Sequence, residues 1–398
     1  MAQDRRIPRR VGGTADIHFP GEPADKRTVS QLQAGVGASD LTESRAAGRT
    51  AARSATVQLD GGRPALVLVL ASVAHDLGEL LAGIREVTGD TPLTGCTTSG
   101  HFYDGVLVHP GGGVVVVVMT AGPYRFGVAS VTGIGADGAG AGSLLARQAR
   151  AAAGEEPSPH ACLLLFADGM CGAHQPLIGG IYRVVGAGVP VVGGAAGDDQ
   201  ALTRTCVFHD DQVLDDAAVG VWIASERPVV VAARHGWQAD GAPLLVTKVE
   251  GTVLAELGGR PVMEVLREHL PTPDDFLLGT GERGGVSIAR GFGLIEPDGS
   301  LLVRGAHIED GTIHTFESLP LYAAVQVVSC TKEDVLAVTG EVVEIVTAGH
   351  EPSLVLAFSC IARLELLGEQ AVEEIGRLQE AAGSARTVGF YTYGEFAR

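Results

Sequence analysis

Three short polar loops stand where strongly apolar segments end, and they hold most of the residues that could do chemistry. They are Thr94-Gly-Cys-Thr-Thr-Ser-Gly100, Val192-Gly-Gly-Ala-Ala-Gly-Asp198 and Val388-Gly-Phe-Tyr-Thr-Tyr-Gly-Glu395. Each loop ends a segment that is predicted to form an apolar strand, a helix and a second strand. Such β-α-β crossovers join parallel strands of one sheet. Open α/β sheets bind ligands at the carboxyl ends of their strands. The three loops are therefore predicted to converge on one small-molecule site.

The first loop has the composition of an anion cradle. Thr97, Thr98 and Ser99 offer hydroxyls and backbone amides between two glycines, which suits a carboxylate or a phosphate. It is not a Walker loop, because no Gly-Lys-Ser/Thr follows. The competing interpretation is a tight turn whose hydroxyls cap the next element. Cys96, directly before the hydroxyls, belongs to the same candidate site.

The second loop adds a carboxylate. Asp198 follows a glycine-rich stretch that includes Gly194, and both residues belong to the predicted site. The carboxylate can accept hydrogen bonds from a ligand ammonium group. The competing interpretation is a solvated turn.

The third repeat supplies a cation and aromatic residues. Arg363, close after Ser359 and Cys360, can clamp a carboxylate with two hydrogen bonds, although a surface ion pair with a nearby glutamate is the simpler interpretation. Tyr391 and Tyr393 alternate along the last strand, so they share one side of it. They can line a pocket, or form a core edge with solvated hydroxyls. Glu395 beside them is a candidate for binding an amine.

Histidines and cysteines leave two further chemistries open. His101 and His174 stand in or beside the recurrent loops, where a neutral imidazole can bind haem iron or a ligand. For any single histidine, an exposed turn residue is the competing interpretation. A thiolate from Cys96, Cys171 or Cys360 is an alternative iron ligand. No CxxC pair is present among the six cysteines, which argues against a zinc ribbon.

The elements that must position these residues indicate a mixed α/β fold. We predict two α/β domains with mixed parallel and antiparallel sheets and recurrent β-α-β units. The predicted divisions are a mobile tail over residues 1–28, an N-terminal domain over 29–226 and a C-terminal domain over 227–398. Four further segments are predicted individually: strands over 54–59 and 229–237, a short helix over 251–257, and a helix over 333–347.

Charge and apolar patterning exclude some classes of function. The net charge of −18 argues against nucleic acid or an anionic membrane as the main partner. The longest apolar run, Val114–Met119, is too short to span a bilayer. No apolar segment of a signal peptide follows the basic start, so we expect a cytoplasmic protein.

Several segments together resemble the FIST domains. Two segments resemble the N-terminal FIST domain: Leu163-Leu-Leu-Phe-Ala-Asp-Gly169 and Val189-Pro-Val-Val-Gly-Gly-Ala-Ala-Gly-Asp-Asp199. Two others resemble the C-terminal FIST domain: Phe358-Ser-Cys-Ile-Ala-Arg363 and Gly389-Phe-Tyr-Thr-Tyr-Gly-Glu395. The resemblance runs from about residue 39 to the end of the chain.

This resemblance implies a sensory protein for intracellular signal transduction that binds a small ligand, such as an amino acid or a related metabolite. Some bacterial members, the NosP-type proteins, bind haem and sense nitric oxide, so haem is the implied cofactor of the alternative. A histidine kinase is the implied kind of partner. Members of the family usually continue past the last loop into a final strand containing His-Asn, which is expected to be missing here because the sequence stops at Arg398.

Three functions follow from these observations. The first is a small-ligand sensor, and the second is the same scaffold holding haem through a histidine. The third is an enzyme with Cys96 or Cys360 as nucleophile, which is the least supported because no histidine stands at a recognisable activating spacing. We therefore expect a binding protein rather than an enzyme.

Overall fold

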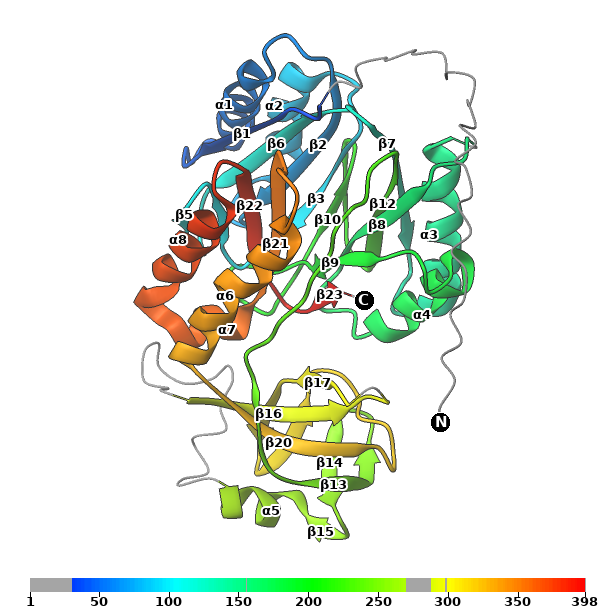
Figure 1. Cartoon of the computed structure of the whole chain (residues 1–398), viewed down its shortest axis with the longest axis vertical. Coiled ribbons are helices and arrows are strands. Elements are labelled where there is room, and N and C mark those ends of the chain that lie inside the picture. The colour runs from blue at the N-terminus through cyan, green and yellow to red at the C-terminus, as the bar shows by residue number, and fades with distance from the viewer. Residues whose placement is uncertain (1–30, 155, 270–287, 298, 398) are drawn as a thin grey trace, which may run out of the picture.

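The computed structural model describes residues 31–154, 156–269, 288–297 and 299–397. The tail predicted over residues 1–28 lies outside the described residues. Within them, mixed parallel and antiparallel sheets alternate with helices, as the sequence predicts (Figure 1). No helix in the described ranges is both long and apolar enough to cross a membrane.

The first unit is a sheet covered by two helices. Its strands β2 and β3 are parallel, β6 pairs antiparallel with β2, and β1 pairs with β6. Its elements are β1 (Ala34–Ser39), α1 (Ser44–Thr56), β2 (Pro64–Ala71), α2 (Leu77–Thr88), β3 (Leu93–Thr97), β4 (His101–Tyr103), β5 (Val106–Val108) and β6 (Val114–Thr120).

The second unit repeats this order. Strands β8 and β9 are parallel, β12 pairs antiparallel with β8, and β7 pairs with β12. Its elements are β7 (Tyr124–Thr132), α3 (Gly138–Ala152), β8 (His160–Ala167), α4 (His174–Val185), β9 (Val191–Ala195), β10 (Val207–His209), β11 (Gln212–Leu214) and β12 (Ala217–Ser225).

A small β domain follows, at the lower end of the molecule in Figure 1. It is reached through residues 228–237, which form no helix or strand. Its own core includes Leu254, Leu266 and Phe292. Its elements are β13 (Gln238–Glu250), β14 (Val253–Leu257), β15 (Arg260–Pro261), α5 (Val262–His269), β16 (Ile288–Ile295), β17 (Leu301–Arg304), β18 (Ala306–Glu309), β19 (Thr312–Thr315) and β20 (Ala324–Thr331).

The third unit returns the chain to the first two. Strands β21 and β22 are parallel, and α6, α7 and α8 pack on one side of them with Phe102 and Tyr391 in the shared core. Its elements are α6 (Lys332–Thr347), β21 (Leu354–Cys360), α7 (Ile361–Leu367), α8 (Ala371–Ala382), β22 (Arg386–Thr392) and β23 (Glu395–Ala397).

The three units exchange strands in a cycle. The hairpin β4–β5 of the first unit pairs with β22 of the third, β10 of the second pairs with β3 of the first, and β23 of the third pairs with β9 of the second. Apolar faces of all three sheets, including Leu68, Phe166 and Phe390, meet in one core. The C-terminal segment therefore completes sheets that the N-terminal half begins.

A glycine stands at the same place in each unit. Gly95, Gly193 and Gly389 lie opposite Val69, Leu165 and Ala357 on the preceding parallel strand. A Cβ atom on these glycines would stand 1.9, 1.9 and 2.1 Å from the facing carbonyl oxygens. Since real Cβ atoms do not approach backbone oxygens this closely, the crossing of the two strands requires glycine.

Two local predictions are wrong because tertiary packing outweighs propensity. Residues 54–59 are not a strand, because they end α1, whose buried face is built from small residues such as Ala47, Ala51 and Ala55. Residues 251–257 do not form a helix. Strand β14 lies there instead, held between β13 and β19.

One further predicted strand is absent from the structure. Residues 229–237 form no strand, although Val229, Val230 and Val231 read as one. Strands β10 and β11 form a hairpin around Asp210-Asp211, and β12 pairs with β7 and β8. The helix predicted over 333–347 is confirmed as α6, with a capping box at Thr331 and Asp334.

Candidate functional site

The three polar loops meet as the repeats predicted. The Ser99 amide donates to the Tyr391 carbonyl oxygen at 3.2 Å, which joins the first loop to the third. The Gly197 amide donates to the Thr97 carbonyl oxygen at 2.9 Å, which joins the second loop to the first. The Ala195 amide donates to the Gly394 carbonyl oxygen at 2.8 Å and closes the circle.

The meeting point of the loops is closed. Thr97, Thr98, Ser99 and Asp198 are fully buried. The Thr97 hydroxyl accepts from the Cys206 amide at 3.0 Å, and Ser99 Oγ accepts from the Gln200 amide. The groups that the sequence offers to a ligand thus have partners within the chain.

Asp198 is the centre of this arrangement. Its carboxylate accepts hydrogen bonds from the amides of Leu202, Thr203 and Arg204 and from the Tyr393 hydroxyl. Burial acts to raise the pKa of Asp198, but these hydrogen bonds, led by that of Tyr393, lower it overall.

The depressed pKa of Asp198 predicts acid sensitivity. Its contribution is present above the unfolded pKa of about 3.9 and is lost as the pH falls through the lower folded value. Asp198→Asn, which turns an amide group toward backbone donors, is expected to cost about 1–3 kcal/mol at pH 7. Urea unfolding at pH 7 and pH 3 tests this, and a variant as stable as the wild type at pH 7 would contradict it.

The two histidines proposed as haem ligands differ in their contacts, because Nε2 of His101 has no hydrogen-bond partner whereas both ring nitrogens of His174 are bonded. His101 is buried, its Nδ1 lies 3.0 Å from Thr98 Oγ1, and burial lowers its pKa to about 3. His174 directs Nδ1 to Glu317 at 3.2 Å and Nε2 to the Asp168 carbonyl oxygen at 2.8 Å. Neither ring nitrogen of His174 is free to bind iron.

Arg363 is likewise held inside the protein. It forms a buried ion pair with Glu374 at 2.6 Å and donates to the Thr339 hydroxyl and the Val335 carbonyl oxygen. Ser359 Oγ and the Tyr391 hydroxyl donate to the same glutamate. Three predicted site residues thus share one partner that the sequence reasoning missed. The available signal was an acidic residue on the apolar face of α8, which Glu374 shares with Ile375 and Leu378.

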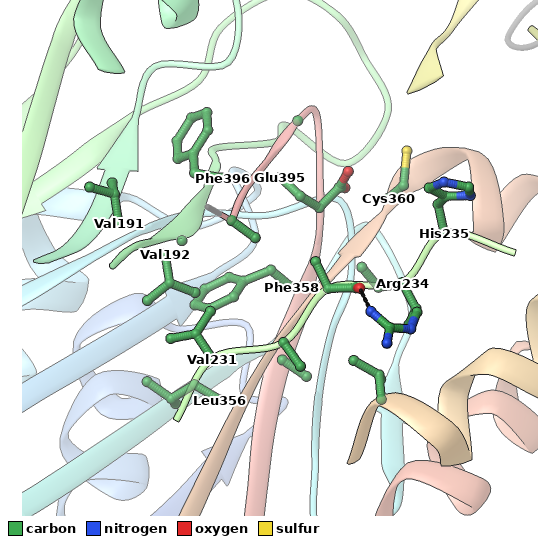
Figure 2. A pocket seen from close by; sticks show the side chains of 18 of the residues that line it. Val191, Val192, Val231, Arg234, His235, Leu356, Phe358, Cys360, Glu395 and Phe396 are labelled. Carbon is green, nitrogen blue, oxygen red and sulfur yellow. Dashed lines mark hydrogen bonds between the residues drawn. The ribbon is translucent and has the colours of Figure 1, made fainter. Parts of the chain in front are cut away.

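This network forms part of the wall of a large cavity, which Arg363, Ser359 and Glu374 help to line. Its volume is about 1680 Å³, above the roughly 300–1,000 Å³ of ordinary ligand pockets. Its walls come from β9 and β23, the segment 228–237, the β domain, α6 and β21. Figure 2 shows apolar side chains gathered on one side of the view: Val191, Val192, Val231, Leu356 and Phe358.

Five of the predicted ligand-binding residues line this cavity: Ser359, Cys360, Arg363, Tyr393 and Glu395. Figure 2 labels two of them, Glu395 and Cys360. Their side chains point toward the same space, with His235 beyond Cys360 (Figure 2). Glu395 accepts from the Thr392 hydroxyl at 2.9 Å, and burial raises its pKa. Its side chain is open to the cavity although protein surrounds it. Burial and, secondarily, Glu395 raise the pKa of the Cys360 thiol well above its usual range.

The remaining predicted residues lie off this cavity or in its frame. Cys96 is fully buried in β3, and burial raises its pKa strongly. Gly194 pairs with Glu395 across β9 and β23, so it holds the glutamate in place through the backbone. Tyr393 lines the cavity, while its hydroxyl is bonded to Asp198.

Sequence reasoning missed the segment 228–237 as a cavity wall. The sequence predicts a strand there, yet the segment forms no backbone ladder in the described structure and lines the cavity along its length. His235 accepts from the Trp237 amide at 3.0 Å and also bonds the Leu301 backbone, and burial lowers its pKa. The available sign in the sequence was that no turn next to the valine run after Pro228 would fold it back against another strand.

The predicted iron ligands do not fit haem as they are placed. An axial ligand must present a free imidazole nitrogen or a thiolate. His174 and His235 use both ring nitrogens in hydrogen bonds, His101 lies outside the cavity lining, and the raised pKa of Cys360 keeps its thiol protonated.

Comparison with known proteins gives relatives along nearly the whole chain. An uncharacterized protein of Mycobacterium tuberculosis is 28% identical over 377 residues, covering 92% of this chain and 94% of the relative. An uncharacterized protein of Mycobacterium bovis is 25% identical over 388 residues, with the same coverage. One of Methanocaldococcus jannaschii is 21% identical over 227 residues, covering 54% of this chain and 43% of the relative.

Among solved structures, a cyanuric acid hydrolase from A. caulinodans covers 49% of this chain and 72% of its own, at 14% identity. Its TM-score of 0.29 is too low to bear on fold or function. The FIST N domain model matches residues 65–260 and the FIST C domain model matches residues 263–398. FIST domains are associated with sensory signal transduction. Because the two matches span most of the sequence, the chain belongs to the FIST family.

Proposed function

We propose that this protein is a sensory module whose cavity binds a small molecule with an apolar body and an amine group. The observation that carries the proposal is the carboxyl group of Glu395, which faces a largely apolar cavity and forms no ion pair among the described contacts. Ligand sites combine apolar walls with a few polar groups that fix orientation. In this cavity Glu395 takes that role.

The amine follows from the electrostatics of Glu395. Among the described residues, no basic side chain forms an ion pair with it. Burial raises the pKa of Glu395 and outweighs the opposing charge of Arg363, so the neutral form is favoured. A ligand ammonium group restores the charged form and gains a charge-assisted hydrogen bond. An amino acid with an apolar side chain, or a related amine, has this chemistry.

The parts of the chain that form the cavity walls suggest how ligand binding is transmitted as a signal. The segment 228–237 carries the chain into the β domain, and it faces β21 of the third unit across the cavity. A ligand held between them favours one arrangement of the β domain against the three α/β units, and it shifts the population by its differential affinity. A cytoplasmic signalling partner, such as a histidine kinase, would then recognise that arrangement.

A haem-dependent sensor is the alternative on the same scaffold, and the placement of the predicted ligands His101 and His174 does not favour it. Titration with haem tests it separately. On the present proposal the visible spectrum stays that of free haem, whereas a sharp Soret band that shifts with nitric oxide would support the alternative.

Glu395→Gln tests the amine-binding proposal directly. In a thermal-shift screen of apolar amino acids and amines, a ligand at 100 times its Kd stabilises the protein by about 2.7 kcal/mol. Loss of the charge is expected to weaken binding of the best ligand by about 1.5–3 kcal/mol, which is at least tenfold in Kd. The amide keeps the shape of the side chain.

Glu369→Gln is the matched control, because Glu369 is exposed in the turn after α7 and lies outside the cavity lining. It should keep the ligand affinity of the wild type. Equal affinity in Glu395→Gln and the wild type would refute recognition of an amine by Glu395.

A further inference from the structure

Strand β21 presents one of its edges to the cavity. All seven of its residues line the cavity, although successive side chains of a strand point to opposite faces. Leu354, Leu356 and Phe358 pack against the central core, and the alternate residues Val355 and Ala357 pack in the core of the third unit. Because both faces pack against protein, the row of backbone groups along one edge is what the strand adds to the cavity wall.

This edge has no partner strand among the described residues. Strand β21 is outermost in the sheet of order β21-β22-β4-β5, and β22 pairs with its other edge. No described backbone hydrogen bond joins β21 to the segment 228–237, which borders the same cavity. An unpaired edge is a template for a further strand, because its N–H and C=O groups remain available for hydrogen bonds.

The cavity has room for a chain of several residues. Its volume of about 1680 Å³ exceeds the roughly 300–1,000 Å³ of ordinary ligand pockets. The seven residues of β21 extend over roughly 23 Å, at about 3.3 Å per residue. A single amino acid would pair with only a small part of this edge, whereas a short extended peptide matches its length.

Glu395 sets the direction in which such a peptide would lie. Its side chain points toward the same space as that of Cys360, the last residue of β21 (Figure 2). A peptide with its N-terminal ammonium group at Glu395 therefore begins at the Cys360 end of the strand and runs toward Leu354. That direction is antiparallel to β21.

The walls beside the edge suit apolar side chains. Leu356 and Phe358 of β21 stand near Val192 of β9 and Val231 of the segment 228–237 in the part of the cavity that Figure 2 shows. Side chains of an added strand point alternately to the two faces of the sheet, so apolar peptide residues would contact these walls.

We propose that the ligand of this cavity is a short peptide with a free N-terminal amine and apolar side chains, and that it adds to β21 as an antiparallel edge strand. This inference rests on the amine-binding function proposed for Glu395 and extends the recognised group to a peptide backbone. Main-chain hydrogen bonds to β21 supply affinity, and the apolar walls select the side chains.

Calorimetric titration of the full chain with leucinamide and with the amides of di-, tri- and tetraleucine tests this proposal. Tetraleucine amide is expected to bind at least about tenfold more tightly than leucinamide, because it adds backbone hydrogen bonds and apolar burial to the same amine. Acetylation of its N-terminus and the variant Glu395→Gln should each weaken binding by about tenfold or more. Glu369→Gln should bind it as the wild type does.

Methylation of single peptide nitrogens separates strand pairing from apolar burial without changing the protein. Successive N–H groups of a β-strand point to opposite edges, so only alternate ones face β21. Of two tetraleucine amides methylated on the nitrogen of the second or of the third residue, one is expected to lose about tenfold in affinity and the other less. Equal affinities of the two isomers would overturn the pairing.

The outcomes distinguish this inference from the function on which it rests. Binding of leucinamide with no gain for tetraleucine amide would overturn the peptide and leave amine recognition by Glu395 in place. Equal binding of leucinamide by Glu395→Gln and the wild type would refute that recognition itself, and binding of neither amide would overturn both. Slow hydrogen exchange of residues 229–236 in the free protein would indicate that this segment occupies the edge, which would also overturn the peptide.

Discussion

Replacing Arg363 by alanine is expected to lower the free energy of unfolding by about 3–5 kcal/mol, because it leaves the Glu374 carboxylate buried without its cation. The two side chains are 13% and 3% exposed, so solvent cannot replace the lost partner. The loss also frees the Val335 carbonyl oxygen and the Thr339 hydroxyl. Because Tyr391 and Ser359 bond the same glutamate, the effect should spread to β21 and β22.

Urea unfolding of the variant against Arg377→Ala checks this expectation. Arg377 pairs with Glu373 on the same helix, but both side chains are more than 40% exposed. Such a pair contributes about 0.3–0.5 kcal/mol. Similar stability losses in the two variants would show that the buried network around Glu374 does not hold the third unit together.

Gly193→Ala is expected to cost about 3 kcal/mol or more, or to prevent folding, because two penalties add at this residue. Its Cβ would stand 1.9 Å from the Leu165 carbonyl oxygen, so β8 and β9 must move apart. The φ angle of 153° adds strain for any residue with a side chain. Gly95 has the same surroundings in the first unit and should respond in the same way.

Gly340→Ala is the matched control for a glycine. It lies inside α6 with nothing within 4 Å of the new Cβ, so alanine should stabilise by about 0.5–1 kcal/mol. Thermal unfolding of both variants measures the difference. A Gly193→Ala protein that melts with the wild type would mean that the strands do not cross as closely as described.

The repeated β-α-β pattern could be predicted from the sequence, because strands buried on both faces consist of continuous apolar runs such as Leu66–Leu70. The exchange of strands between units could not be predicted from the sequence. Strands as short as β4, β10 and β23 have three residues each, and their partners lie in other units of the fold. Such pairing depends on tertiary contacts, and the local sequence pattern around each strand does not indicate its partner.

The candidate site shows the same division. Glu395 and Cys360 were predicted at strand ends and do line the cavity. Thr97, Thr98 and Asp198 were predicted on the same ground, but their loops bond to each other and close. Strand ends mark where polar groups gather, whereas the opening of a cavity depends on segments such as 228–237, whose position follows from packing against distant elements.

Hydrogen exchange with and without the most stabilising amine of the thermal-shift screen tests the central claim, namely that the cavity is the ligand site. Residues 229–236 form no backbone ladder in the described structure, so their amides should exchange by local motion and report binding directly. The account predicts slower exchange in 229–236, 354–363 and 393–396 on ligand addition. Protection confined to the loops at 94–101 and 195–199 would contradict it and return the ligand to the site where the three strand ends meet.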